Sequence, residues 1–193
     1  MPLLTIGTPA DAAVITNNFL PVLSGTASDP ESGITAVTVY LLRFADSEFH
    51  YWNGSSWTPT PTSLESTYDH STGRWESTSS LPSGANLPNG TYQVQVSVQN
   101  GENPTGVAGL GTLFTVDYHP VYVWNGNFNS EWDLAINWTP ANVPPTNAIV
   151  VINYGSCDAR HLGNIQIHGV TLTSGTLQSS GMFVKKLNVS GGS

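Results

Sequence analysis

The clearest pattern along the chain is strict alternation of apolar and polar residues, which predicts β-strands. In GTYQVQVSVQ (residues 90–99), Tyr92, Val94, Val96 and Val98 share one side, and glutamine or serine occupies most of the other. A period of two residues is typical of a strand with one buried face. The alternation therefore predicts a half-buried strand in this stretch.

Further strands are predicted on both sides of that stretch. ITAVTVYLL places Val37, Val39 and Leu41 on one face, and LFTVD predicts a strand that ends near Asp117. No segment sustains the apolar spacing of three and four residues that an amphipathic helix requires. The turn sequences SDPESG, WNGSSW, DHSTGRW and LPNG separate the strands. Short strands at this spacing predict an antiparallel β-sandwich over residues 1–117.

The pattern changes in residues 118–193. Short apolar pieces return every dozen or two residues in IVVINYG, NIQIHGVTLTSGTLQSSG and FVKKLNVSGG, with glycine and serine between them. Such returns predict stacked rungs at the start of a β-solenoid, or β-helix. Two or three rungs bury little core by themselves, so we expect the natural chain to continue with more of them.

Composition narrows the classes of partner. Only 9% of the 193 residues are charged, against roughly a quarter in an average soluble domain, and the net charge is −8. Five Lys and Arg residues form no basic stripe, so nucleic acid and anionic membrane surfaces are not expected partners. No apolar run has the length of a membrane span, so membrane insertion is not expected.

Residues 20–117 contain SGTASDPESGITAVTVYL, then Trp52, Trp57 and Trp75, and then LPNGTYQVQVSVQNGENPTG. With these features they resemble the Ig-like modules repeated in large bacterial surface proteins. In that family the last stretch usually ends in an Asp-x-x-Gly-Asn turn, whereas this chain has Asn100 in place of the aspartate. The resemblance implies an extracellular building block with an Ig-like sandwich fold.

Residues 122–152 contain a Trp-x-Gly, a second Trp, an Asn-Trp pair and a proline before a strand. These are Trp124, Gly126, Trp132, Asn137, Trp138, Pro144 or Pro145, and the strand AIVVI. They resemble a second bacterial pattern, which opens β-helical segments of autotransporter-like and other secreted adhesin-type proteins. Neither resemblance implies a particular chemistry.

Tryptophans are the first candidate ligand-binding residues. Trp52, Trp57 and Trp132 would stack on sugar rings if they lay in an open groove. Alternatively, Trp52 and Trp57 pack across a hairpin, and the tryptophans of residues 124–138 close the end of the solenoid, where an apolar interior would otherwise meet water. We favour the architectural interpretation.

Two turns carry candidate ligands for Ca²⁺, which prefers oxygen donors. They are Asp29 and Glu31 in SDPESG, and Asn100 and Glu102 in NGENP. A calcium site requires both turns to lie at the same end of the sandwich. Otherwise Asp29 and Glu31 simply cap a turn in water. No other cofactor is expected.

Catalysis is not expected. Cys157, Asp158, His161 and His168 supply the residue types of a Cys-His nucleophile, but their spacing does not require them to meet, and a lone cysteine in an apolar strand is usually packing. A glycan-cleaving β-helix needs clustered carboxylates, and Asp158 is the only acid after Ile149.

The sequence therefore predicts a non-enzymatic structural or adhesive module of a large secreted or surface-anchored bacterial protein. It would serve as a spacer and presentation unit, located outside the cell or on its surface. Its expected partners are neighbouring domains of the same protein, other copies of the chain, or surface glycans. The alternative is a carbohydrate-binding accessory module of a secreted glycan-degrading enzyme.

Overall fold

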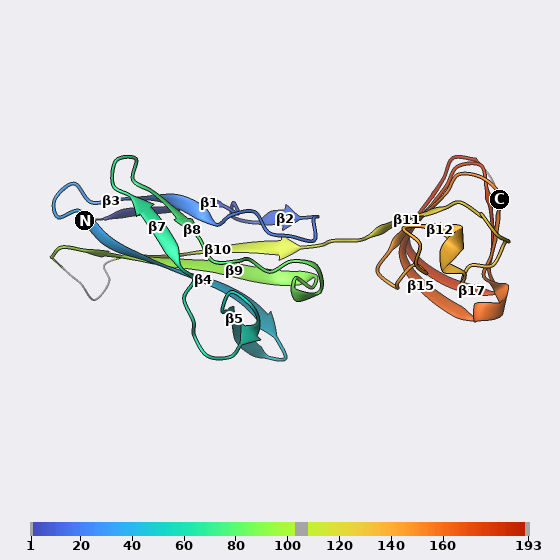
Figure 1. The fold of residues 1–193 in the computed structure, drawn as a ribbon, viewed down its shortest axis with the longest axis horizontal. Coiled ribbons are helices and arrows are strands. Elements are labelled where there is room, and N and C mark those ends of the chain that lie inside the picture. Colours follow the sequence, from blue (N-terminus) through green and yellow to red (C-terminus); the bar gives the residue numbers. More distant parts are fainter. Residues whose placement is uncertain (1, 103–107, 192–193) are drawn as a thin grey trace. The chain divides into compact units, whose positions relative to one another are not determined.

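Residues 2–102 and 108–191 are described by the structure, a computed structural model, and within them the chain is all-β. Helix in these residues is confined to three short 3₁₀ turns: η1 (Gly84–Asn86), η2 (Ala135–Asn137) and η3 (Arg160–Leu162). The prediction of an all-β chain is confirmed. The chain divides into two compact units, Met1–Tyr118 and His119–Ser193 (Figure 1).

The first unit contains a four-stranded antiparallel sheet with the strand order β1-β3-β8-β7. Its strands are β1 (Leu3–Thr8), β3 (Ser24–Ser28), β7 (Ser66–Asp69) and β8 (Arg74–Ser77).

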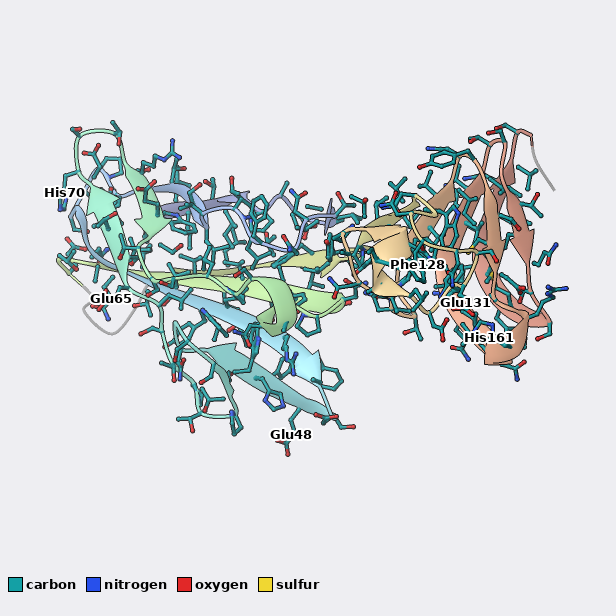
Figure 2. The ribbon with its side chains drawn as sticks, turned by 45° about the vertical axis from the view of Figure 1, so that its right-hand side comes forward. Glu48, Glu65, His70, Phe128, Glu131 and His161 are labelled. Atoms are coloured by element: carbon teal, nitrogen blue, oxygen red, sulfur yellow. The ribbon has the colours of Figure 1, made fainter. Side chains whose placement is uncertain are left out.

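A six-stranded sheet with the order β2-β10-β9-β4-β5-β6 completes the first unit. Strands β2 and β10 run parallel, and every other neighbouring pair is antiparallel. Glu48 marks the turn end of the long β4–β5 hairpin (Figure 2). The strands are β2 (Ala13–Ile15), β4 (Ile34–Ala45), β5 (Glu48–Trp52), β6 (Trp57–Thr58), β9 (Gly90–Asn100) and β10 (Ala108–Val116).

The two sheets share one apolar core, as the alternating sequence requires. The predicted inward face of β9 is buried, and its glutamines are half-buried on the opposite face. Trp75 of β8 is fully buried in this core and donates its indole N–H to the carbonyl of Thr5, 3.1 Å away. Gly25 makes room for that ring, because a Cβ there would lie 2.7 Å from it. The first unit is thus β-sandwich-like.

The second unit is built around a five-stranded sheet with the order β12-β11-β13-β15-β17. Strand β12 is antiparallel to β11, and the other neighbours are parallel. A separate parallel pair joins β14 (Ser156–Asp158) to β16 (Thr176–Gln178). The five strands are β11 (Val121–Trp124), β12 (Trp138–Thr139), β13 (Ile149–Ile152), β15 (Asn164–Leu172) and β17 (Gly181–Val189).

Successive turns of the second unit stack in register. Ile149 pairs with Gly169, and Ser156 pairs with Thr176, so both strand pairs have the same offset of 20 residues. The hydrogen bonds continue between the connecting segments, where Ser180 donates its hydroxyl to the carbonyl of Arg160 at 2.6 Å. Segments 149–158 and 169–178 therefore lie one above the other.

Inward-facing side chains form columns across the stacked strands. One column contains Tyr122, Val150, Val170 and Leu187, whose exposed fractions are 9%, 0%, 1% and 63%. A second column runs through Ile152, Leu172 and Val189, and its exposed fraction likewise increases sharply at the last residue. The first column is buried at its β11 end and the second at its β13 end, and both are exposed to solvent at β17.

Candidate functional site

Trp52 and Trp57 face each other across the β5–β6 hairpin. The two residues are direct pairing partners, and their ring centroids lie 5.3 Å apart. Trp52 is only 2% exposed and donates its indole N–H to the carbonyl of Ser80 at 2.7 Å. Its ring offers no open face for a sugar.

Trp57 is half-buried and more accessible than Trp52. Its indole N–H donates to the carbonyl of Asn86 at 2.7 Å, and its ring lies 5.7 Å from that of Tyr92. The guanidinium of Arg43 sits 5.2 Å from the ring centroid, within the range of a cation–π contact. Trp57 therefore ties the hairpin to the sheet, and part of its ring is occupied by a cation.

Three indoles of the second unit form one buried cluster. The ring of Trp138 lies 5.0 Å from that of Trp124 and 4.7 Å from that of Trp132, in edge-to-face orientations. Trp138 donates its indole N–H to the carbonyl of Trp132 at 2.7 Å. Trp132 is 2% exposed, so it presents no platform to a sugar. The cluster belongs to the core at the β11–β12 end of the sheet, opposite to β17.

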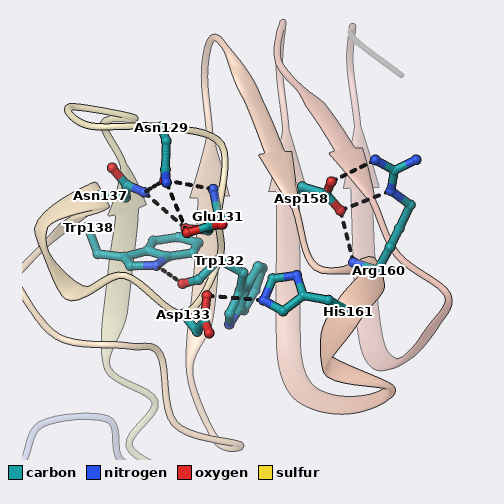
Figure 3. A network of polar contacts seen from close by, with 9 residues as sticks. All are labelled: Asn129, Glu131, Trp132, Asp133, Asn137, Trp138, Asp158, Arg160 and His161. Atoms are coloured by element: carbon teal, nitrogen blue, oxygen red, sulfur yellow. Dashed lines mark hydrogen bonds and ion pairs between the residues drawn. The ribbon is translucent and has the colours of Figure 1, made fainter.

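Asn137 organises the loop that carries this cluster (Figure 3). Its side chain is completely buried, and its amide oxygen accepts the backbone N–H of Phe128 at 3.0 Å. Its amide nitrogen donates to Asn129 Oδ1 at 2.9 Å and to the carbonyl of Glu131 at 3.0 Å. A buried polar group with such partners fixes one loop conformation, because any other leaves those partners unpaired.

The backbone conformation explains why the Trp-x-Gly sequence ends in glycine. Gly126 has φ of +52°, and a Cβ there would lie 3.1 Å from the indole nitrogen of Trp124. Positive φ favours glycine, and the contact leaves little room for a side chain. This part of the second resemblance therefore corresponds to a local packing requirement.

Titratable side chains form two contacts near this loop (Figure 3). Arg160 holds both oxygens of Asp158, at 3.0 and 2.7 Å, and these bonds lower the pKa of the Asp158 carboxyl to about 2. His161 Nε2 lies 3.2 Å from Asp133 Oδ1, and both side chains are about half exposed. The contact between His161 and Asp133 is exposed to solvent, and contacts of this kind contribute little to stability.

Cys157 is fully buried in the second core. Burial raises the pKa of its thiol far above the ordinary value, and the nearby Asp158 carboxylate raises it further. The thiolate is the nucleophilic form of cysteine, so this side chain is unsuited to attack at neutral pH. Of its suggested partners, His161 contacts Asp133, and His168 stacks on His119 with ring centroids 3.3 Å apart.

The structure brings together two of the four candidate calcium ligands. Asn100 donates its side-chain amide to Asp29 Oδ2 at 2.7 Å, and both residues are buried. This bond is the main reason that the pKa of Asp29 lies below its usual range. Glu31 and Glu102 are exposed.

The bond between Asn100 and Asp29 thus attaches the turn to the end of β9. Asp29 also accepts the backbone N–H of Glu31 at 3.2 Å and the hydroxyl of Ser32 at 3.1 Å. No group of three or more His, Cys, Asp or Glu side chains suited to a metal occurs among the described residues. Residues 103–106 of the predicted turn lie outside them, and calcium binding stays a prediction.

Sequence reasoning missed the side chains that hold the second loop together. Asn137 was noted only as part of an Asn-Trp pair, and the contribution of Asn129 and Glu131 was not predicted. The sequence signal for these contacts was an asparagine-rich loop, NGNFNSEWDLAIN, which lies between Trp124 and Trp138 and contains Trp132. A polar residue there must be hydrogen-bonded if the indoles around it are buried.

The comparisons with known proteins find no match to this chain among family models, curated proteins or solved structures. Within the described residues, no helix has both the length and the apolar character needed to cross a membrane.

Proposed function

We propose that the chain is a non-enzymatic structural module of a large secreted or surface-anchored bacterial protein. In this proposal an Ig-like sandwich acts as a spacer and presentation unit, and the second unit is the aromatic-capped start of a β-solenoid. The observation that carries it is the pair of columns closed beside the indole cluster and open at β17. Such columns suit stacking of further strands rather than chemistry.

The Ig-like assignment is supported by the topology of the first unit. Its N-terminal segment contributes β1 to one sheet and β2 to the other, and β2 runs parallel to β10. The remaining strands follow the order of an Ig sandwich, with β3, β8 and β7 facing β10, β9 and β4. Tyr92, near the start of β9, donates its hydroxyl to the carbonyl of Pro88, which resembles the tyrosine corner of Ig domains.

The solenoid assignment is supported by the parallel pairing of β11, β13, β15 and β17 and by the offset of 20 residues that the β13–β15 and β14–β16 pairs share. Each added coil covers the apolar side chains of the coil before it, which is how solenoids build a core. The indole cluster supplies the cover at the β11–β12 end.

A surface location is supported by composition. Few charges and many Ser, Thr and Asn residues suit close packing against neighbouring domains or other copies, because few charges lose their water. A protease added to intact producing cells should therefore degrade the module. Cleavage that occurs only after lysis would contradict a surface location.

A chain lengthened by one coil tests the structural proposal directly. Residues 173–189 lead from the end of β15 through β17, so repeating them once after Val189 adds one coil in register. In the 193-residue chain Leu187 is mostly exposed, and Leu187→Asn should change the free energy of unfolding by less than about 0.5 kcal/mol. In the lengthened chain the first Leu187 is covered, and the same substitution should cost about 2–3 kcal/mol.

Phe183 provides the matched control. It lies on the same strand but pairs with the exposed Gln166 and points away from the core. Phe183→Asn should therefore have the same small effect in both chains. An equal cost of Leu187→Asn in the two chains would contradict the stacking proposal.

A further inference from the structure

The outer face of the six-stranded sheet carries a groove. It encloses about 300 Å³ over strands β4, β9 and β10, at the lower end of the range for small-molecule sites. Gln95 of β9 lies between Tyr40 of β4 and Gly111 of β10 in the strand register. Tyr40 and Gln95 each alternate with core residues along their strands. The groove therefore lies on the side of the sheet turned away from the core.

Two glycines give the groove its open floor. Gly109 and Gly111 alternate on β10, where each lowers the stability of a strand by roughly 0.5–1 kcal/mol relative to alanine. Neither has a positive φ. A Cβ at Gly109 would meet nothing closer than 3.9 Å, and one at Gly111 would meet only the flexible end of Gln93, at 2.8 Å.

Folding of β10 thus does not require either glycine. A glycine inside a strand that has no conformational role commonly marks the close approach of a ligand or of another backbone. Here the space that the missing side chains leave is the groove itself.

The groove walls combine planar amides with an aromatic ring. Gln95 Nε2 donates to Gln93 Oε1 at 2.9 Å, which holds both amides in a row along β9. Each of these amides has further donor or acceptor positions for a ligand. Tyr40 packs edge-on against Tyr51, with ring centroids 6.0 Å apart, and Ser97 adds a hydroxyl to the lining.

The aromatic row continues beyond the groove. Tyr40 and Phe44 share a face of β4, and Phe44 contacts Phe49 of β5 at 5.3 Å between ring centroids. Both phenylalanines are exposed. Phe44 and Phe49 form the pair next to Ala45 and Glu48, so the row runs toward the turn of the β4–β5 hairpin. Figure 2 labels Glu48 at this turn.

We propose that this groove binds a neutral glycan chain. Amides and a hydroxyl match the sugar hydroxyls, Tyr40 offers an apolar surface to the sugar ring, and the glycines allow the ring to approach the sheet. The lining contains no charged residue, which favours a neutral ligand over a uronic acid or a phosphate. This binding role goes beyond the structural role and does not depend on the stacked strands of the second unit.

Titration of the ¹⁵N-labelled chain with neutral hexasaccharides tests the proposal. The probes are cellohexaose, xylohexaose, mannohexaose and laminarihexaose, with hexagalacturonate as the acidic comparison. At least one neutral probe should shift the backbone amides of Gly109 and Gly111 and the side-chain amides of Gln93 and Gln95. Amides of the second unit should not move.

Gly111→Val fills the groove on a face where the backbone has room, and it should weaken binding of the active probe at least tenfold. Thr115→Val is the matched control, because Thr115 lies on the same face of β10 outside the groove lining. It should leave affinity unchanged, and unchanged backbone spectra elsewhere should show that both variants fold.

Three results would overturn the proposal. The first is the absence of binding to every neutral probe at millimolar concentration. The second is equal affinity in the parent and in Gly111→Val. The third is sedimentation of the parent as a dimer that Gly111→Val converts to a monomer, which would make this face a contact between copies.

Discussion

Replacing Asn137 with alanine should destabilise the second unit by about 3 kcal/mol. The side chain is fully buried and makes three hydrogen bonds, to Phe128, Asn129 and Glu131. Each bond contributes about 0.5–1.5 kcal/mol net, and removal also leaves partly buried partners without this bond. The sum is roughly 2–4 kcal/mol.

Urea unfolding followed by the indole N–H signals in ¹H–¹⁵N spectra measures this loss unit by unit. Trp52, Trp57 and Trp75 report on the first unit, and the three tryptophans of residues 124–138 report on the second. With a urea slope of about 1–3 kcal/mol per molar, the midpoint of the second unit should fall by about 1–3 M. The midpoint of the first unit should not change.

The exposed Asn142 supplies the comparison, since it is an asparagine of the same unit outside the buried core. Asn142→Ala should change the free energy of unfolding by less than about 0.5 kcal/mol. The reasoning would be refuted if Asn137→Ala had an equally small effect.

Further predictions concern both cores and one ion pair. Gly25→Ala should lower the thermal midpoint of the first unit, since its Cβ would clash with the carbonyl oxygen of Thr5 and with the ring of Trp75, and overpacking costs about 1–3 kcal/mol. Asp158→Asn should lose stability mainly above pH 4. Arg160 lowers the pKa of the Asp158 carboxyl to about 2, so the stability that the carboxylate contributes is present above its ordinary pKa of 3.8 and is lost as pH falls through 2. Urea titrations at pH 6, 4 and 2 should therefore show the difference in unfolding free energy between parent and variant decreasing. Cys157 should resist alkylation by iodoacetamide at pH 8 until urea unfolds the second unit, which mass spectrometry detects.

Strands with strict alternation were predictable from local sequence. The side chains of Val94 and Val98 are buried as their spacing predicts, because a period of two allows only one face to meet the core. Leu42 shows where the rule fails. It lies on the outward face of β4 yet is buried, opposite Tyr51 and Gln93 in the register. Burial of this kind depends on side chains of neighbouring strands, which strand pairing brings together.

The candidate sites were less predictable than the strands, because they too depend on which strands pair with one another. Sequence reasoning named Trp52 and Trp132 as candidate sugar-binding residues but favoured a packing role for them. Both are buried, because an indole has a large apolar area to remove from water. The groove depends on the register of three strands, which aligns Tyr40, Gln95 and Gly111 although they are far apart in sequence. Register follows from long-range pairing and is not visible in a local pattern.

Hydrogen exchange of the Trp138 indole N–H tests most directly whether the tryptophans of the second unit form a closed interior. This group is buried and bonded to the carbonyl of Trp132. It should exchange only when the unit unfolds, and its signal should stay fixed as hexasaccharides are added. Exchange at the rate of a free indole, or a shift of the signal on addition of sugar, would contradict the account.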